Sequence, residues 1–177
     1  MGALEMNLQE DELLHLVQRW RNVNINIKNF WYNVGNAALE TVSKQKPMRV
    51  GKITFEYYDN YLFIKLPSGR KLSYFNPMLK RNIYGKESLT YEGIATNKKW
   101  QRIETYGPKL VENIVQGISR DILAHAMMNL KRRNFKIVMH VHDEVVLEVK
   151  KNQVTVEEIC EIITIPPPYA EDLCLKA

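Results

Sequence analysis

The sequence predicts an α+β fold in which an antiparallel sheet packs against long helices. Apolar residues recur at helical spacing near the N-terminus and again after residue 108. Between these regions lie short β-branched and aromatic runs separated by turn residues, and a second β-rich pair surrounds two adjacent acids near the C-terminus. The chain has 177 residues, of which 45% are hydrophobic, so one core is expected. We therefore expect residues 1–177 to form a single domain or part of one.

Two helices are expected within residues 1–46. Three acids favour the start of the first helix, and the apolar residues after them recur at helical spacing. These residues are Glu10, Asp11 and Glu12, then Leu13, Leu16, Val17 and Trp20. The second apolar stripe consists of Ile27, Phe30, Trp31, Val34 and Ala38, and Pro47 lies beyond its end. Both helices are expected to face a core.

Residues 52–75 contain three β-rich runs, KITFEYY, YLFIKL and RKLSYF. Asp59-Asn60 and Pro67-Ser68-Gly69 separate them and are good turn sequences, so an antiparallel meander of three strands is expected. Residues 76–106 show no clean period. Loops with short elements are expected there.

A long helix is expected over residues 109–133, with Asn134 as its cap. Its expected buried face consists of Val111, Ile114, Val115, Ile118, Ile122 and Ala126. Glu112, Gln116 and Arg120 lie on a different stripe, at i, i+4 and i+8. A hairpin over residues 136–150, expected to belong to the same antiparallel sheet, and a helix over 155–163 should follow. Thr155 and Glu158 have the spacing of a capping box, and Pro166-Pro167-Pro168 should end this helix and leave an extended tail.

The composition indicates an intracellular, cytoplasmic protein. No apolar stretch is long enough to span a membrane, and the N-terminus does not resemble a signal peptide. Cys160 and Cys174 are too few and too isolated for a disulfide framework. The net charge of +5 suits a phosphate-rich partner, although many proteins that never meet nucleic acid have a similar charge.

The most distinctive local sequence is His140-Val141-His142-Asp143-Glu144, flanked by apolar residues. Adjacent carboxylates at a hairpin tip repel each other unless a cation compensates, and Mg²⁺ prefers such hard oxygen donors. The simpler reading is an exposed acidic turn between two strands. A further alternative is a zinc site, because His140 and His142 at i and i+2 would share one face of a strand. That alternative lacks a third ligand in the same motif.

Several segments together resemble A-family DNA polymerases of the phage or prophage type. Residues 105–149 are similar to the last long palm helix and the carboxylate hairpin of that family, in which HDE closes the third conserved motif. The helix carries Gln116 and, further on, Asp121, as the family does. The run LPSGRKLSY resembles the strand between the fingers and this helix, and MGALEM with the helical segment after it resembles the family's segment just after the fingers helix. The resemblance covers most of the chain in the right order.

The resemblance implies that Asp143 coordinates a catalytic Mg²⁺ and that Glu144 supports it. His142 would lie beside the primer terminus, and Gln116 would reach the minor groove of the terminal base pair. Glu112 and Arg120 flank Gln116 on the same helix stripe and would also face DNA; without the family match, these are solvated helix residues. The implied substrates are primer–template DNA and deoxynucleoside triphosphates, and the implied chemistry is two-metal phosphoryl transfer.

The chain also departs from the family. Many members carry Asn and Arg where this sequence has Glu112 and Pro108. None of the aspartates has the context of the family's other essential aspartate; these are Asp11, Asp59, Asp121, Asp143 and Asp172. The fingers lysine and arginine are also missing. We therefore expect a partial polymerase domain that is inactive alone, needs the N-terminal polymerase portion, and can self-associate. The alternatives are a non-catalytic nucleic-acid-binding module and, less favoured, a zinc hydrolase.

Overall fold

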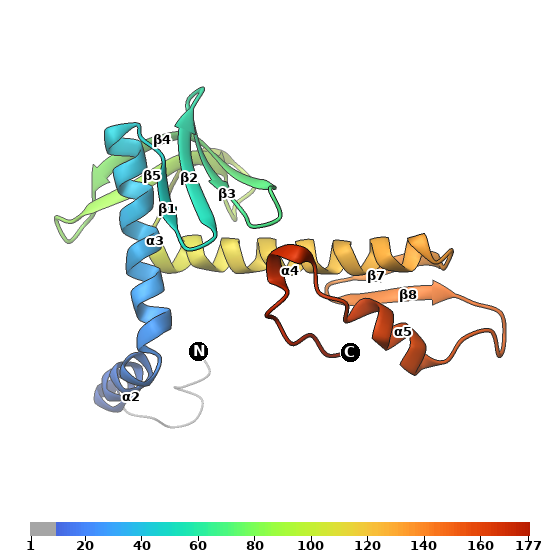
Figure 1. Ribbon diagram of the computed structural model, residues 1–177. Coiled ribbons are helices and arrows are strands. Elements are labelled where there is room, and N and C mark those ends of the chain that lie inside the picture. The colour runs from blue at the N-terminus through green and yellow to red at the C-terminus, as the bar shows by residue number, and fades with distance from the viewer. Residues whose placement is uncertain (1–9) are drawn as a thin grey trace.

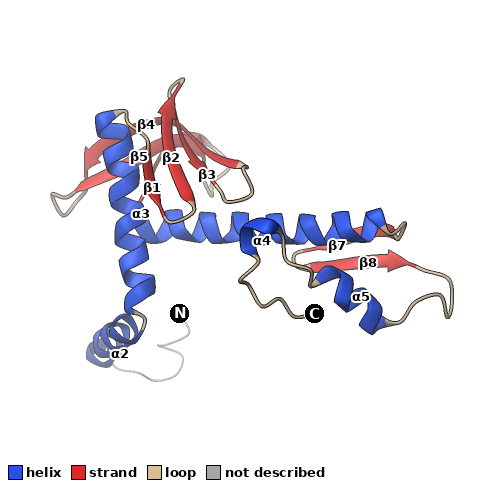
Figure 2. Ribbon diagram, viewed as in Figure 1, coloured by secondary structure: helices blue, strands red, loops and turns tan. Residues whose placement is uncertain are grey.

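The computed structural model describes residues 10–177, and the opening MGALEM, which contributes to the family resemblance, lies outside them. The fold is α+β, as expected from the sequence. Two antiparallel sheets lie near opposite ends of one long helix, α4 (Gly107–Arg132), and a second long helix, α3 (Ile25–Lys44), crosses its N-terminal end (Figures 1 and 2). The larger sheet packs at this crossing, and the smaller sheet lies along the C-terminal half of α4.

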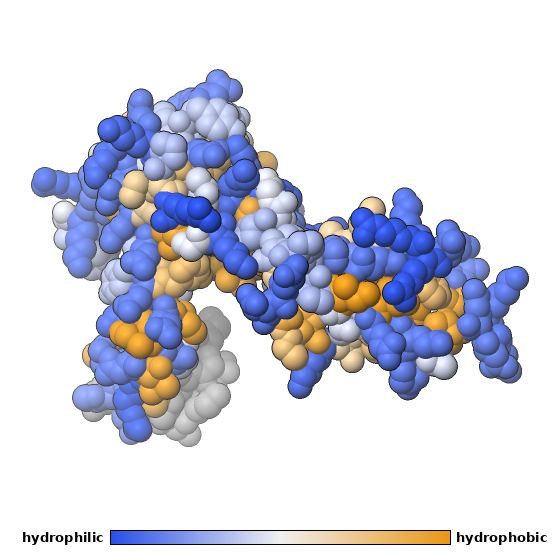
Figure 3. Space-filling view, viewed as in Figure 1, coloured by the Kyte–Doolittle hydropathy of each residue, from blue (hydrophilic) through white to orange (hydrophobic). Residues whose placement is uncertain are grey.

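The two expected N-terminal helices are present, but only the second faces the core. Helix α2 (Glu10–Val23) is separated from α3 by Asn24 alone. Its expected core residues Leu16, Val17 and Trp20 are 46–47% exposed, which contradicts the prediction for this helix. The reason is that α2 projects from the fold and packs chiefly through Trp20, which stacks on Trp31 of α3 with ring centroids 5.7 Å apart. Figure 3 shows the apolar residues of α2 at the surface.

The larger sheet has six strands, in the order of the sequence, and every neighbouring pair is antiparallel. The strands are β1 (Met48–Val50), β2 (Ile53–Tyr58), β3 (Tyr61–Lys65), β4 (Lys71–Arg81), β5 (Glu87–Ile94) and β6 (Trp100–Thr105). Asp59 and Asn60 form the predicted turn between β2 and β3, both with positive φ. The predicted meander is therefore present and is extended by further strands.

Residues 76–106 are mostly β-structure, so the prediction of loops for this segment was wrong. Polar side chains replace the usual apolar face there and hide the period of two. Arg102 donates to the carboxylate of Glu92 at 2.7 Å and to the carbonyl of Asn76 at 2.9 Å. Asn76 has a φ of 47° at a bulge in β4, which accommodates Pro77 within the strand.

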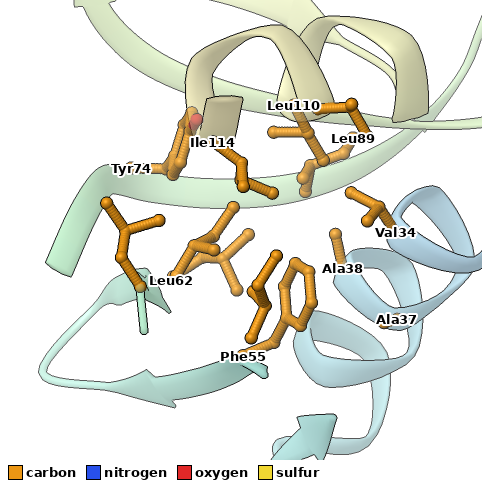
Figure 4. Packing of buried hydrophobic residues seen from close by; sticks show 13 residues of the cluster. Val34, Ala37, Ala38, Phe55, Leu62, Tyr74, Leu89, Leu110 and Ile114 are labelled. Carbon is orange, nitrogen blue, oxygen red and sulfur yellow. The ribbon is translucent and has the colours of Figure 1, made fainter. Parts of the chain in front are cut away.

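The core lies between α3, the first half of α4 and one face of the larger sheet. Figure 4 shows Phe55 and Leu62 from the sheet packed toward Val34 and Ala38 of α3, with Ile114 of α4 above them. All five side chains are fully buried. Val115 is different: it was expected on the buried face but is exposed, because it lies one residue beyond Ile114 and points away from the sheet.

Helices α3 and α4 approach closely at two glycines. A Cβ on Gly107 would lie 2.1 Å from the carbonyl oxygen of Trp31, and a Cβ on Gly35 would lie 3.2 Å from the Cα of Gly107. Pro108 follows within the first turn of α4, where its missing N–H costs nothing, so the helix begins two residues earlier than expected. Because Gly107 has no side chain, the first turn of α4 can pack directly against the backbone of α3.

The hairpin is not part of the larger sheet, which corrects our expectation of one sheet. Strands β7 (Lys136–Val141) and β8 (Glu144–Glu148) form a separate two-stranded sheet beside α4 and α5 (Val156–Ile163). The predicted capping box of α5 is present: Thr155 and Glu158 each accept a hydrogen bond from the other's backbone N–H. The expected extended tail contains a short 3₁₀ helix at Pro168–Ala170.

Both cysteines are free thiols; Cys160 is partly buried and Cys174 is exposed. Within residues 10–177, no helix is long and apolar enough to cross a membrane.

Replacing Gly107 with alanine should lower the free energy of unfolding by about 2 kcal/mol or more, because backbone must move to admit the Cβ. Gly35→Ala is the matched comparison: its Cβ meets a milder contact, and alanine's better helix propensity offsets up to about 1 kcal/mol. Urea unfolding of both variants would measure the difference. Equal stability of the two variants would contradict the described crossing.

Candidate active site

The turn of the β7–β8 hairpin consists of His142 and Asp143, between the paired residues Val141 and Glu144. His142 has a φ of 51°, whereas Asp143 has no positive φ. These are the φ signs of a type II′ turn, whose first position favours glycine. A histidine there is strained by about 1–2 kcal/mol. Positive φ also occurs at other turns, such as Asp59-Asn60, so the two adjacent carboxylates rather than the backbone make this hairpin a candidate site.

The hairpin presents its acids to solvent. His142, Asp143 and Glu144 are all exposed. Behind the two carboxylates lies a groove of about 750 Å³ between α4, β8, α5 and the C-terminal segment. The groove walls include Leu123 and Ile159 and are mainly apolar, as the orange surface at that end of the molecule shows (Figure 3). The carboxylates therefore lie at the edge of an apolar depression and remain accessible to an ion or a ligand.

His140 connects the hairpin to α4. The guanidinium of Arg120 lies 3.4 Å from Nε2 of His140, within hydrogen-bonding distance. His142, by contrast, belongs to the turn, so the expectation that both histidines share one strand face was wrong. With a cation at its Nε2, His140 is poorly placed to bind zinc. The zinc alternative loses its geometric basis.

The predicted polar stripe of α4 is exposed. Gln116 donates to the carboxylate of Glu112 at 3.5 Å, and Lys109 forms a salt bridge with the same carboxylate at 2.9 Å. The Glu112 carboxylate holds the pKa of Lys109 above its usual value, chiefly through this hydrogen bond. Arg120 reaches the hairpin, whereas Glu112 lies two turns away, about 12 Å along the axis. Gln116 thus lies on α4 between the Lys109–Glu112 salt bridge and the residue that contacts the hairpin, Arg120.

Gln116 and Arg120 line a shallow groove of about 550 Å³ together with Arg70 and Lys71 at the start of β4. Lys71 forms a salt bridge with Glu56 at 2.6 Å, and the hydrogen bond to Glu56 raises the pKa of Lys71. Tyr74 also lines the groove; burial raises its pKa to about 12, against the opposing effect of a hydrogen bond from Asn113. The groove therefore combines cations with a neutral phenol.

Arg70 forms an anchor that the sequence did not reveal. Its Nε donates to Asp121 at 2.6 Å and its Nη2 to the carbonyl of Gly117 at 2.8 Å, while Ser68 donates to the other oxygen of Asp121 at 2.5 Å. The Asp121 side chain is only 11% exposed. A Cβ on Gly117 would lie 3.3 Å from Nη2 of Arg70 and 2.8 Å from Leu66, so this position favours glycine.

One hint of this anchor was present in the sequence: Arg70 and Asp121 each belong to a segment that resembles the polymerase family. They lie 51 residues apart, and their pairing required the fold. The anchor attaches the middle of α4 to the larger sheet. Asp121 is thereby occupied and is not placed with Asp143 in the described structure.

The hairpin acids match magnesium in their chemistry but are too few to hold it by themselves. Asp143 and Glu144 supply hard, accessible oxygen donors of the kind that Mg²⁺ prefers. Among residues 10–177, however, no group of three or more His, Cys, Asp or Glu side chains is placed to hold a metal ion. The donor type fits magnesium, and the remaining ligands must come from water, substrate or another segment.

Comparison with known proteins gives a specific result. Across 179 aligned residues, covering the whole chain, the sequence is 46% identical to a protein named DNA polymerase from Bacillus phage SP02. The chain is similar to part of a phage DNA polymerase. It spans about 28% of the length of that relative. No family model matches the chain, and the comparison with solved structures gives no significant match.

Replacing His142 with glycine should stabilise the hairpin by about 1 kcal/mol relative to His142→Ala, since only glycine adopts the positive φ without steric cost. Both variants remove the imidazole, so their difference isolates the backbone. The free energy of unfolding of each variant would be measured in urea. An alanine variant as stable as the glycine variant would show that the turn is not strained.

Proposed function

We propose that this chain supplies the C-terminal part of the palm of an A-family DNA polymerase. In this role it carries one of the two carboxylate motifs for magnesium-dependent, template-directed transfer of nucleotides to a primer 3′-end. The observation that carries the proposal is the similarity to a phage DNA polymerase over the whole chain. The aligned region therefore includes this chain's accessible Asp143-Glu144 hairpin. The proposed setting is the cytoplasm of a bacterium or of a phage-infected cell.

Asp143 is the proposed metal ligand, and Glu144 supports it from the adjacent position. When bound, Mg²⁺ would stabilise the charge that develops on the reacting oxygens during phosphoryl transfer. The protein's own contribution is to hold one carboxylate in the short turn and the next at the first residue of β8. Their exposure supports the proposal, because substrate phosphates and a second segment must reach the same ion.

The face of α4 beside the hairpin is the proposed DNA-binding surface. Gln116 would approach the minor groove of the terminal base pair, where its amide can contact acceptors common to all pairs. Arg120 and Glu112 flank it, and Arg120 also orients the hairpin through His140. His142 would lie beside the primer terminus. In the adjacent groove, Arg70 and Lys71 are paired with Asp121 and Glu56, whereas Arg120 forms no salt bridge within the described residues and supports a nearby phosphate backbone.

The proposal requires further polymerase segments. Two metal ions need carboxylates from two motifs, and no group of three or more potential metal ligands is assembled within residues 10–177. Apolar side chains on the hairpin are 41–55% exposed and offer a surface for a missing segment or for self-association. These are Val138, Met139, Val141 and Val146. We propose that the isolated chain does not extend primers.

One observation favours an alternative, a non-catalytic nucleic-acid-binding module. The groove beside Gln116 contains Arg120, which forms no salt bridge within the described residues and requires no metal to attract a phosphate. Such a module would depend on Arg120 and on salt, and it would be indifferent to the charge of Asp143. The two functions therefore make opposite predictions for Asp143.

The test is a chimera in which this chain replaces the matching 28% of the SP02 phage polymerase, assayed for primer extension. In an active chimera, Asp143→Asn should reduce extension at least about a hundredfold, as expected when charge stabilisation in the transition state is lost. Asp59→Asn is the matched control, since Asp59 also occupies an exposed two-residue hairpin turn; its effect should stay within about twofold.

Full extension by the Asp143→Asn chimera would refute the metal role, and retained DNA binding would then favour the binding module. The 177-residue chain assayed alone is expected to give no extension. Extension by that chain alone would contradict the proposed need for further segments.

A further inference from the structure

A second cavity, of about 680 Å³, lies at the opposite end of α4 from the hairpin. It is bounded by α3, the turn between β4 and β5, and the first turn of α4. Gly107 lies in its wall and precedes Arg120 by 13 residues, about 20 Å along the helix axis. The proposed function assigns no role to this cavity. Its volume lies within the range of small-ligand sites.

Aromatic side chains from three elements line the cavity. Tyr84 of the β4–β5 turn is 79% exposed, Tyr32 of α3 is 62% exposed, and Tyr106 before α4 is 60% exposed. The ring contacts found within residues 10–177 include none of these three. Trp31, partly buried, adds a fourth aromatic side chain. Unoccupied aromatic faces at a concave surface suit a flat, stacking ligand.

Three cations accompany the aromatic side chains: Arg21, Lys28 and Lys86. None of them takes part in a salt bridge of the described part of the chain. Two carboxylates also line the cavity, and one of them, that of Glu104, accepts a hydrogen bond from Ser88 at 2.6 Å. The free cations therefore favour an anionic group next to the stacking ligand.

A buried hydroxyl gives independent evidence for a ligand. Thr105 lines the cavity and is 2% exposed, and its Oγ1 has no hydrogen-bond partner among residues 10–177. Buried polar groups are nearly always hydrogen-bonded, because an unpaired one destabilises the fold. A polar edge of a bound molecule would satisfy this hydroxyl.

We propose that this cavity binds one unpaired nucleotide of a single-stranded nucleic acid. The base lies against the aromatic side chains, its polar edge reaches Thr105, and the phosphates lie near Arg21, Lys28 and Lys86. The preference for a strand over a free nucleotide rests on the proposed polymerase function. The assignment of the site itself rests on its aromatic, cationic and hydroxyl groups and not on that function. Asp143 takes no part in this site.

The test uses the full 177-residue chain and a fluorescein-labelled oligothymidine of about 12 nucleotides, within the site sizes of single-strand binders. Anisotropy would measure binding. Tyr84→Ala should weaken it at least about fivefold through loss of a base stack, whereas Tyr84→Phe should stay within about twofold. Tyr84 is highly exposed, so both variants should fold; circular dichroism would check this.

Charge is tested with a matched pair of lysines in hairpin turns. Lys86→Ala should weaken binding and reduce its salt dependence. Lys99→Ala should not, because Lys99 lies in the β5–β6 turn outside the cavity. Oligonucleotides containing 5-iododeoxyuridine should cross-link to Trp31 or Tyr84.

Any of these results would overturn the proposal: no binding of oligothymidine, unchanged binding by Tyr84→Ala, or cross-links confined to the β7–β8 hairpin. Free thymidine monophosphate is the competing probe. Displacement of the strand by this mononucleotide at equal concentration would identify a free-nucleotide site and refute strand binding. Failure of the Asp143 chimera test would leave all these measurements unaffected, so the two proposals can fail separately.

Discussion

Helices α3 and α4 cross at Gly35 and Gly107, where a single added Cβ would come within 2.1 Å of a backbone oxygen. This contact fixes the first turn of a helix that is 26 residues long, about 39 Å. Every site residue predicted from the sequence lies on this helix or on the hairpin packed along its far half. A small change of angle at the crossing would therefore move the hairpin by several ångströms relative to the larger sheet.

Two further contacts hold the helix and hairpin in place. Arg70 joins the larger sheet to Asp121 and Gly117 at the middle of α4, and Arg120, the residue before Asp121, reaches His140 of the hairpin. Hydrogen bonds to a charged, mostly buried carboxylate contribute about 1.5–3 kcal/mol, whereas a typical hydrogen bond contributes about 0.5–1.5 kcal/mol, and the Arg120–His140 contact is exposed and 3.4 Å long. The Arg70 anchor is therefore the stronger of the two, and the hairpin itself is held more loosely. A loosely held hairpin with an exposed apolar face fits a surface completed by another segment.

The sequence predicted those features that depend on local patterns. The long helix, the hairpin around Asp143 and the capping box at Thr155 are present as expected, because spacing and turn chemistry determine them. Strands β5 and β6 were missed, since Arg102 and Glu92 replace the apolar alternation with a polar network. The exposure of α2 and the separation of the two sheets depend on tertiary packing, which no local pattern encodes. The same holds for the Arg70 anchor and for the aromatic cavity.

The central claim is that the hairpin acids form part of a divalent-metal site, and paramagnetic broadening by Mn²⁺ tests it most directly. Mn²⁺ takes the same oxygen ligands as Mg²⁺ and broadens the NMR signals of nearby backbone amides. In the 177-residue chain, the account predicts that the amides of Asp143 and Glu144 broaden first and that Asp143→Asn removes this effect. Broadening centred on other acids, or unchanged in the Asp143→Asn variant, would contradict it.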